Sequence, residues 1–361
     1  MHLAHLRLRD FRNYVRLDAD FAPGFHVLLG NNAQGKTNIL EAIYLIATYR
    51  SFRGSGGAQI VRQGQTGYFV GARIVGQGEH NVRIYWSRNE RKLALDSRPI
   101  RKLSEYLGVL RAVVFCSEDA WLVKGPGSRR RRFLDLLLAQ TEAAYLPLLQ
   151  RYVRAVRARN ALLKQRSQDE ASMESFTREV TAAGREILQF RALILPQFLP
   201  MAQRSYASIS GGSEELRIDY QSTVKNDFEV ELARNRERER ILRTTVIGPH
   251  RDDLKLSLNG LAAADYASEG QKRSLVIALK MAQAEYLTLV HGVPPILLID
   301  DIMGELDLQR RSGFLPLLQQ ADRARSQVFM TCTEENWPRE LTQSLARWEV
   351  KAGKLNRIDP H

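Results

Sequence analysis

The stretch Gly30-Asn31-Asn32-Ala33-Gln34-Gly35-Lys36-Thr37 decides how the rest of this 361-residue chain is organised. The apolar run Phe25–Leu29 before it predicts a buried strand, and residues 38–48 after it carry apolar side chains at helical spacing. A G-x-x-x-x-G-K-T loop between a strand and a helix is typical of a phosphate-binding loop. The alternative is a chance glycine turn before a helix, and the complete spacing with both flanks disfavours it.

The chemistry of such a loop gives its parts distinct roles. Gly30 and Gly35 let the backbone curl so that its N–H groups point at phosphate oxygens, and the positive end of the following helix adds to the attraction. Lys36 is expected to reach the outer phosphates, and the Thr37 hydroxyl is expected to hold Mg²⁺. The loop therefore predicts ATP with Mg²⁺ as the cofactors.

A second acidic motif lies far along the chain. The fully apolar run 296–299 predicts a buried strand, and it ends in Asp300-Asp301. An acidic residue at the end of such a strand is the usual partner of a phosphate loop. Asp300 is expected to serve the Mg²⁺ shell, and Asp301 to orient the attacking water. Two acids that merely cap a strand end are the alternative, which the phosphate loop upstream disfavours.

Residues 268–273, Ser-Glu-Gly-Gln-Lys-Arg, begin a predicted helix. A serine hydroxyl, backbone N–H groups and the helix dipole at such a position attract an anion. Because one chain already has a phosphate loop, a second phosphate-reading segment fits best if it contacts ATP held by another copy in a two-fold dimer. The alternative is an ordinary helix cap made by Ser268.

Composition restricts the class of protein. Fifty-three Lys and Arg against 40 Asp and Glu give a formal charge of +13, which favours a polyanionic partner such as nucleic acid over a merely soluble basic surface. No apolar run is long enough to span a membrane, and the first residues lack the apolar centre of a secretory signal. Cys116 and Cys332 are too few for a disulfide or metal framework, which predicts a cytoplasmic protein.

The basic residues are not spread evenly. Four arginines are consecutive at 129–132, and others recur every three residues along one side of a predicted helix, with Arg159 extending that surface. Salt-sensitive, largely sequence-independent contact with a nucleic acid backbone is expected from them. A solvated helix start or an internal salt-bridge cluster is the alternative for 129–132. The predicted contact set is Arg129, Arg130, Arg131, Arg132, Arg151, Arg154 and Arg157.

The chain divides into three predicted parts. Residues 1–128 and 244–361 are expected to form an ATPase core, and residues 129–243 an inserted, mainly helical lobe. Strands are predicted in the core at 68–75, 81–86, 91–96 and 327–330, the last followed by a short tail. In the lobe, Pro196 and Pro200 are expected to end or kink a long helix that begins near Ser172.

The motifs also carry a resemblance. The phosphate loop, the serine segment 268–273, Asp300-Asp301 and Gly304–Asp307 occur in the order seen in ABC-type ATPases. Within that class the chain resembles the RecF family of SMC-like ATPases over residues 6 to about 333. The additional matching motifs are Leu8-x-x-Phe11-Arg12-Asn13-Tyr14, residues 117–119, 122–125, 130–135 and 248–253.

The resemblance implies an α/β fold: an ABC-type P-loop ATPase head, a mixed sheet with an antiparallel β subdomain, plus the inserted helical lobe. It implies a weak ATPase that dimerises with ATP, binds single-stranded and duplex DNA in recombinational repair and replication restart, and works with RecR and RecO to load RecA. The ATPase subunit of another machine, a transporter motor or another SMC-like complex, is the alternative.

The resemblance also implies residue roles. Arg12 and Asn13 contact nucleotide, and Asp307 belongs to a loop that crosses the dimer interface. The ATP held by the opposing subunit is read by Ser268, Gly270 and Gln271. Asp301 stands where ABC-type ATPases usually have Glu; its carboxylate is one methylene shorter, so slow turnover is expected. The Mg²⁺-sensing glutamine of the class is not assigned, with Gln63 and Gln65 as guesses.

Overall fold

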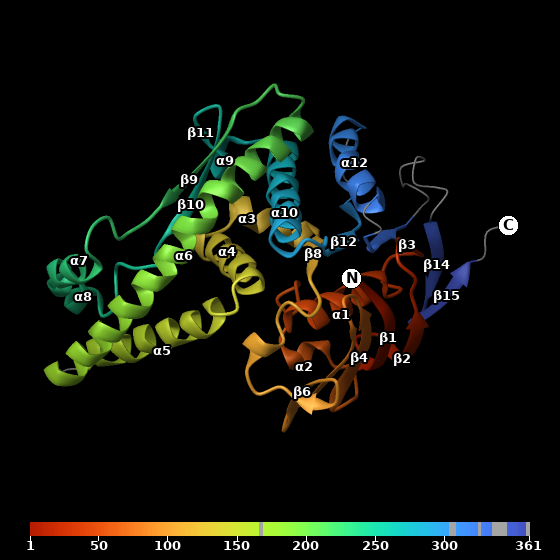
Figure 1. The fold of residues 1–361 in the computed structure, drawn as a ribbon, viewed down its shortest axis with the longest axis horizontal. Helices are drawn as coiled ribbons and strands as arrows, with labels where there is room; N and C mark the ends of the chain where they lie inside the picture. The colour runs from red at the N-terminus through yellow and green to blue at the C-terminus, as the bar shows by residue number, and fades with distance from the viewer. Residues whose placement is uncertain (166–168, 303–307, 324–325, 334–344, 359–361) are drawn as a thin grey trace. The chain divides into compact units, whose positions relative to one another are not determined.

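The computed structural model describes the chain except residues 166–168, 303–307, 324–325, 334–344 and 359–361 (Figure 1). Its contacts group the residues into two compact units. The first unit contains Met1–Asp119, Ser205–Ser213 and Arg273–His361, and the second contains Ala120–Arg204 and Glu214–Lys272. Residues 244–272, which the sequence analysis assigned to the core, group with the second unit because a strand within them pairs with a strand before residue 243.

The first unit is built around a six-stranded sheet in the order β15-β14-β3-β13-β12-β8 (Figure 1). All neighbouring pairs except the β14–β15 hairpin are parallel. The carboxyl ends of the parallel strands therefore meet at one edge, where ligands bind in sheets of this kind. The strands are β3 (Phe25–Leu29), β8 (Ala112–Phe115), β12 (Ile296–Asp300), β13 (Val328–Cys332), β14 (Leu345–Lys351) and β15 (Lys354–Ile358).

A second, antiparallel sheet of the first unit has the order β2-β1-β4-β5-β6-β7. Its strands confirm those predicted at 68–75, 81–86 and 91–96. They are β1 (His2–Phe11), β2 (Tyr14–Asp20), β4 (Gly67–Val75), β5 (Glu79–Ser87), β6 (Arg91–Leu95) and β7 (Arg98–Pro99). The helical segments of this unit are α1 (Lys36–Thr48), α2 (Gly57–Ile60), η1 (Leu103–Glu105), η2 (Ser117–Ala120), most of α10 (Glu269–His291) and α12 (Leu308–Arg323).

The second unit is mainly helical but has a sheet of its own. A three-stranded antiparallel sheet has the order β11-β10-β9. Its strands are β9 (Leu216–Gln221), β10 (Asp253–Leu258) and β11 (Leu261–Ala262). The helices are α3 (Trp121–Lys124), α4 (Gly127–Thr141), α5 (Tyr145–Leu163), most of α6 (Glu170–Ser210), α7 (Phe228–Arg234), α8 (Arg236–Leu242) and α9 (Ala263–Tyr266).

The long helix α6 corrects the expectation that Pro196 or Pro200 ends it. It runs for 41 residues and contains both Pro196 and Pro200, neither of which ends it. Both prolines are exposed, whereas Ile194, Phe198 and Ala202 on another face are buried. A proline inside a helix costs about 3 kcal/mol, and burying a large apolar side chain returns about 1.5–3 kcal/mol. Burial of that face therefore sustains the helix through both prolines.

The predicted tail after β13 is a second correction. Instead of a short tail, residues 345–358 contain the β14–β15 hairpin, and β14 pairs with β3 inside the central sheet. Trp348 and Val350 of β14 are buried. The alternation of these apolar residues with polar ones, followed by the turn at Ala352-Gly353, is the signal that could have predicted the hairpin.

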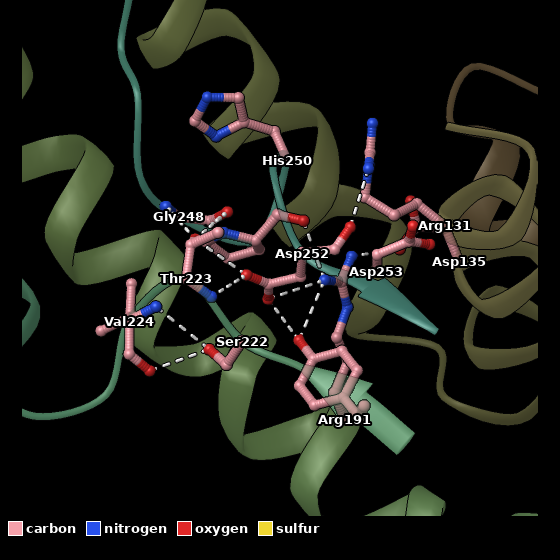
Figure 2. A network of polar contacts seen from close by, with 12 residues as sticks. Arg131, Asp135, Arg191, Ser222, Thr223, Val224, Gly248, His250, Asp252 and Asp253 are labelled. Carbon is pink, nitrogen blue, oxygen red and sulfur yellow. Dashed lines mark hydrogen bonds and ion pairs between the residues drawn. The ribbon is translucent and has the colours of Figure 1, made fainter. Parts of the chain in front are cut away.

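The second unit is held by a buried polar network around Arg191 of α6, which is 1% exposed (Figure 2). Its guanidinium donates to Asp135 at 2.9 Å and to Asp252 at 3.3 Å. Asp252 is fully buried and also accepts from the N–H and hydroxyl of Thr223, at 2.7 and 2.9 Å. The motif at 248–253 therefore contributes to the architecture of this unit. Among the helices in the described ranges, none is long and apolar enough to cross a membrane.

Candidate nucleotide-binding site

The two glycines of the phosphate loop are required by their surroundings. Gly35 has φ +118°, and a Cβ atom there would lie 2.8 Å from side-chain atoms of Asn13 and 2.9 Å from the Tyr14 hydroxyl. A Cβ atom on Gly30 would lie 2.3 Å from the backbone oxygen of Val350. Cβ atoms essentially never come this close to other heavy atoms, and Gly30 also has a positive φ of +150°, so each position favours glycine. The loop can adopt this curvature because Gly30 and Gly35 have no side chain.

Lys36 begins α1 and folds back over the loop. The residue is 7% exposed, and its ammonium donates to the backbone oxygen of Asn31 at 3.0 Å and to that of Gly30. Burial lowers its pKa, while the charges of Asp301 and Asp300 oppose that shift. Carbonyl oxygens are weak partners for a buried ammonium, so phosphate oxygens would satisfy Lys36 better.

Thr37 and Asp300 come together from opposite ends of the chain. The Thr37 hydroxyl donates to Asp300 Oδ1 at 2.8 Å, and the Thr331 hydroxyl at the end of β13 donates to the same oxygen at 2.9 Å. Burial raises the pKa of Asp300, and the two hydroxyl donors oppose this shift. A carboxylate beside a threonine hydroxyl is a pair of hard oxygen donors, which suits Mg²⁺. The residues present therefore fit the predicted metal.

Asp301 has an unusual backbone. Its φ is +54°, in the left-handed region that non-glycine residues rarely adopt, and its N–H donates to the Thr331 hydroxyl at 2.9 Å. Such a conformation costs on the order of 1–3 kcal/mol and is found most often at functional sites. Asp301 is exposed, unlike its buried-strand neighbour Ile299. Thr331 thus positions both acidic residues at the end of β12.

The remaining loop residues divide into two groups. Asn31, Asn32 and Ala33 are exposed at the crown of the loop. Gln34 is held instead: its backbone oxygen accepts from the Asn13 side chain at 2.8 Å, and its side-chain oxygen accepts from the N–H of Ala352 at 2.7 Å. Asn13, predicted to contact nucleotide, therefore supports the loop directly.

Arg12, which was predicted to contact nucleotide, also has several partners within the protein. Its guanidinium makes two hydrogen bonds to the fully buried carboxylate of Glu41, at 2.6 and 2.8 Å. It also donates to the Ser55 hydroxyl and to the backbone oxygen of Gln59. These bonds join α1 to residues 55–59. The structure thus gives the Arg12 side chain a bracing role, which the sequence did not reveal because its partners are 29 to 47 residues away.

The serine segment forms a reciprocal cap at the start of α10. The N–H of Ser268 donates to the Gln271 side chain at 2.6 Å, and the N–H of Gln271 donates to the Ser268 hydroxyl at 3.2 Å. This is a capping box, so the helix-cap alternative is realised in this structure. Gln271 also donates to Glu214 at 2.8 Å. Ser268 is exposed, Gly270 is partly exposed, and all three belong to the second unit.

The predicted DNA-contacting arginines behave unequally. Arg130 makes two bonds of 2.7 Å to Asp253 and donates to the backbone of Leu122 and Gly125, and Arg131 donates to the backbone oxygen of Asp252 at 2.7 Å. These two side chains are occupied inside the unit. The internal-cluster alternative is therefore correct for Arg130 and Arg131. Arg129 and Arg132 are exposed.

The α5 arginines also differ. Arg151 pairs with Glu179, whereas Arg154 and Arg157 are exposed, and within the described residues no ion pair engages them. Arg159 does not extend the basic surface: it is 3% exposed and pairs with the fully buried Glu239 at 2.6 Å. Asp307, like Gly304, lies outside the described residues.

These features define a class of protein. The first unit has a parallel sheet with a phosphate loop after β3 and an acid at the end of β12, together with an antiparallel sheet. The second unit has a capped serine segment. Together these features define an ABC-type ATPase head of the SMC-like kind. The family model described as "RecF/RecN/SMC N terminal domain" matches residues 2–354. The chain belongs to the RecF family.

Relatives agree on this membership. The chain is 39% identical to the DNA replication and repair protein RecF of Symbiobacterium thermophilum, over 98% of each chain. It is 36% identical to the RecF protein of Rippkaea orientalis, over 99% of this chain and 100% of that one.

Solved structures agree on the fold. A structure described as the recombination mediator protein RecF-ATP in the RecFOR pathway has a TM-score of 0.90 and 27% identity, over 99% of this chain and 98% of that one. The Smc head domain of Pyrococcus furiosus, with a TM-score of 0.58 and 16% identity over 99% and 96%, shares the fold. The fold class expected from the sequence is confirmed.

Proposed function

We propose that this protein binds ATP and Mg²⁺ at Gly30–Thr37 and uses the nucleotide to control its grip on DNA during replication and repair. The observation that carries the proposal is the 2.8 Å bond between Thr37 and Asp300, which assembles the two halves of a Mg²⁺ site beside Lys36. Family membership and the 27% identical RecF-ATP structure support ATP as the nucleotide. Membership of the RecF family also disfavours a transporter motor.

Each residue then has a chemical task. Lys36 exchanges its backbone carbonyl partners for phosphate oxygens. Thr37 and Asp300 hold Mg²⁺, which neutralises charge on the phosphates when bound. Asp301 orients the attacking water as general base. Its short side chain and strained backbone fit weak ATP hydrolysis, which suits a switch better than a motor.

The site is proposed to be incomplete within one copy. Ser268, Gly270 and Gln271 of one subunit would face the γ-phosphate held by the other, with Asp307 at the interface between them. The Ser268 hydroxyl is already aligned at a helix start, and the positive end of α10 favours an anion there. ATP would thus promote a homodimer.

DNA is the proposed macromolecular partner, contacted through its backbone without sequence preference. The exposed arginines proposed for this contact are Arg129, Arg154 and Arg157. RecR and RecO are further proposed partners, because the RecF-ATP relative is described as part of the RecFOR pathway. A cytoplasmic location is proposed with them.

The test of the nucleotide site is Lys36→Met, measured by equilibrium binding of ATP with Mg²⁺. Binding should fall by on the order of 100-fold or more, because the phosphates lose their buried cation. Lys255→Met, which changes an exposed lysine of β10, is the matched control and should bind ATP normally. Undiminished binding by Lys36→Met would refute the assignment of the site.

A further inference from the structure

The strand register places the C-terminal hairpin against the phosphate loop. β14 runs parallel to β3, with Glu349 opposite Leu29. β3 ends at Leu29, whereas β14 continues to Lys351 and turns at Ala352-Gly353. The tip of the hairpin therefore lies alongside the loop that follows β3.

The backbone of β14 contacts the first residue of the loop. Gly30 is so close to Val350 that a side chain on Gly30 would overlap the Val350 backbone oxygen, at 2.3 Å from Cβ. This contact fixes where the loop leaves the sheet. It also means that a change in the path of β14 would move the loop.

The turn itself holds the far side of the loop through Gln34. The N–H of Ala352 donates to the side-chain oxygen of Gln34 at 2.7 Å, and the N–H of Gly353 donates to its backbone oxygen at 3.1 Å. Asn13 donates to the same backbone oxygen at 2.8 Å. Three hydrogen bonds thus fasten one loop residue to parts of the chain more than 20 and more than 300 residues away.

The shape of the turn explains why it can do this. Ala352 and Gly353 have φ of +49° and +70°, both left-handed, as in the tight two-residue turns of hairpins. A Cβ atom on Gly353 would lie 2.6 Å from the backbone oxygen of Asn13. Only glycine allows the turn to approach both Gln34 and Asn13. Gly353 therefore has two reasons to be glycine: its left-handed φ and its close approach to Asn13, the residue that also bonds to Gln34.

We propose that the turn Ala352-Gly353 is a positioning element of the nucleotide site, which presets the curvature of the phosphate loop through Gln34 before ATP binds. The inference rests on the proposed nucleotide function. A ligand binds more tightly to a loop that is already ordered, because less conformational entropy is lost on binding. The hairpin thus contributes to ATP affinity, and no contact of its own with the nucleotide is needed.

The test compares two glycines with the same backbone strain. Gly260, in the β10–β11 turn, has φ +81° and follows Asn259 at +49°, but a Cβ atom there meets nothing within 4 Å. Gly353→Ala should weaken binding of ATP with Mg²⁺ by about tenfold, whereas Gly260→Ala should change it less than twofold. Thermal unfolding of both variants provides the control for general loss of stability.

A second readout does not need ATP. Hydrogen exchange of the backbone amides at 31–35 in the nucleotide-free protein should be faster in Gly353→Ala and unchanged in Gly260→Ala. If Gly353→Ala matches Gly260→Ala in both ATP affinity and exchange, the inference is wrong. If Gly353→Ala does not fold, Gln34→Leu is the second variant. It removes the bond from Ala352 and a longer bond, 3.4 Å, from the Gln34 side chain to the backbone oxygen of Asn32, and it should still speed exchange and weaken binding by a few-fold.

The two proposals fail separately. Wild-type protein that binds no ATP would refute the proposed function, and the exchange measurement would still decide whether the turn orders the loop. The other outcome is that the wild type, Gly353→Ala and Gln34→Leu all bind ATP equally tightly and exchange their loop amides equally slowly. That result would support the proposed function and overturn the role of the hairpin.

Discussion

The Arg191 network and the Lys36–Asp300 site are both buried clusters of charge, and they are satisfied to different degrees. In the network, Arg191 has two carboxylate partners, and Asp252 accepts from arginine, threonine and tyrosine groups. At the phosphate loop, Lys36 has backbone carbonyl partners, and burial raises the pKa of Asp300. In the first cluster the charges of Arg191, Asp135 and Asp252 are paired within the protein, although Arg191 Nε has no hydrogen-bond partner among the described residues. The second cluster is better matched to a ligand that brings negative charge and a metal.

This difference indicates that the charges of the Arg191 network stabilise the fold, whereas those of the Lys36–Asp300 site serve ligand binding. A buried cluster whose charges are paired loses much of its contribution to stability when one partner is removed, because the remaining charges are left unpaired. A cluster that is only partly matched destabilises the free protein slightly, and removing a member relieves that strain while it abolishes function. Mutations in the two places should therefore change opposite properties.

The largest expected effect is that of Arg191→Leu. It leaves Asp135 and Asp252 without their cation and should lower the free energy of unfolding by about 3–5 kcal/mol. Arg217→Leu, which breaks an exposed pair with Asp219, should cost less than about 1 kcal/mol. Chemical denaturation measures both. A stable Arg191→Leu variant would show that the network is not required for the fold.

Lowering the pH should destabilise the protein by protonating two buried histidines, one in each unit. Burial lowers the pKa of His26 and of His250 to about 4. Each is neutral in the folded protein, so its contribution to stability is present above pH 6.5 and is lost as pH falls toward 4. The loss is on the order of 3 kcal/mol per histidine.

Unfolding free energies measured between pH 7 and pH 4.5 test this expectation. The slope of the unfolding free energy against pH should be smaller in His250→Gln than in the wild type, and the difference should correspond to nearly one proton. Equal slopes for wild type and His250→Gln would contradict the lowered pKa.

Asp300→Asn should affect chemistry and spare the fold. ATP turnover should fall by on the order of 100-fold, because Mg²⁺ loses a carboxylate ligand. The melting temperature should stay the same or rise, because an acid whose charged form is disfavoured by burial has been removed. Asp265→Asn, at an exposed position of α9, should change neither property. A marked loss of stability in Asp300→Asn would show that Asp300, like Asp252, is needed for the fold.

The smallest effect is expected at the exposed arginines. Arg157→Ala should weaken DNA binding by a few-fold and reduce the slope of log affinity against log salt concentration by about one. Arg130→Ala should instead lower the melting temperature, because it breaks the pair with Asp253. Titrations with DNA at several salt concentrations distinguish the two. A reduced slope for Arg130→Ala would restore that residue to the DNA-contacting set.

Local patterns in the sequence predicted the parts that depend on local chemistry. The loop Gly30–Thr37, the apolar strand before Asp300 and the helix start at residues 268–273 are short motifs whose spacing is set by the backbone. Their assembly into an ABC-type head followed from the family resemblance. The meeting of Thr37 with Asp300 agrees with that assembly.

What the sequence did not reveal depends on distant partners. Arg130 looked like surface charge because Asp253 is 123 residues away, and Arg159 looked exposed because Glu239 is 80 residues away. Pro196 gave a helix-breaking signal that burial of the opposite face overrides. The hairpin was missed because its role is to pair with β3, which lies near the other end of the chain.

That pairing has a consequence for folding during synthesis. β3 and the phosphate loop leave the ribosome early, but both sheet neighbours of β3, β13 and β14, follow roughly 300 residues later. Synthesis at about 5–20 residues per second makes this an interval of tens of seconds. Throughout this interval the loop lacks its contacts with Val350, Ala352 and Gly353, so we expect the nascent chain to bind nucleotide more weakly than the finished protein.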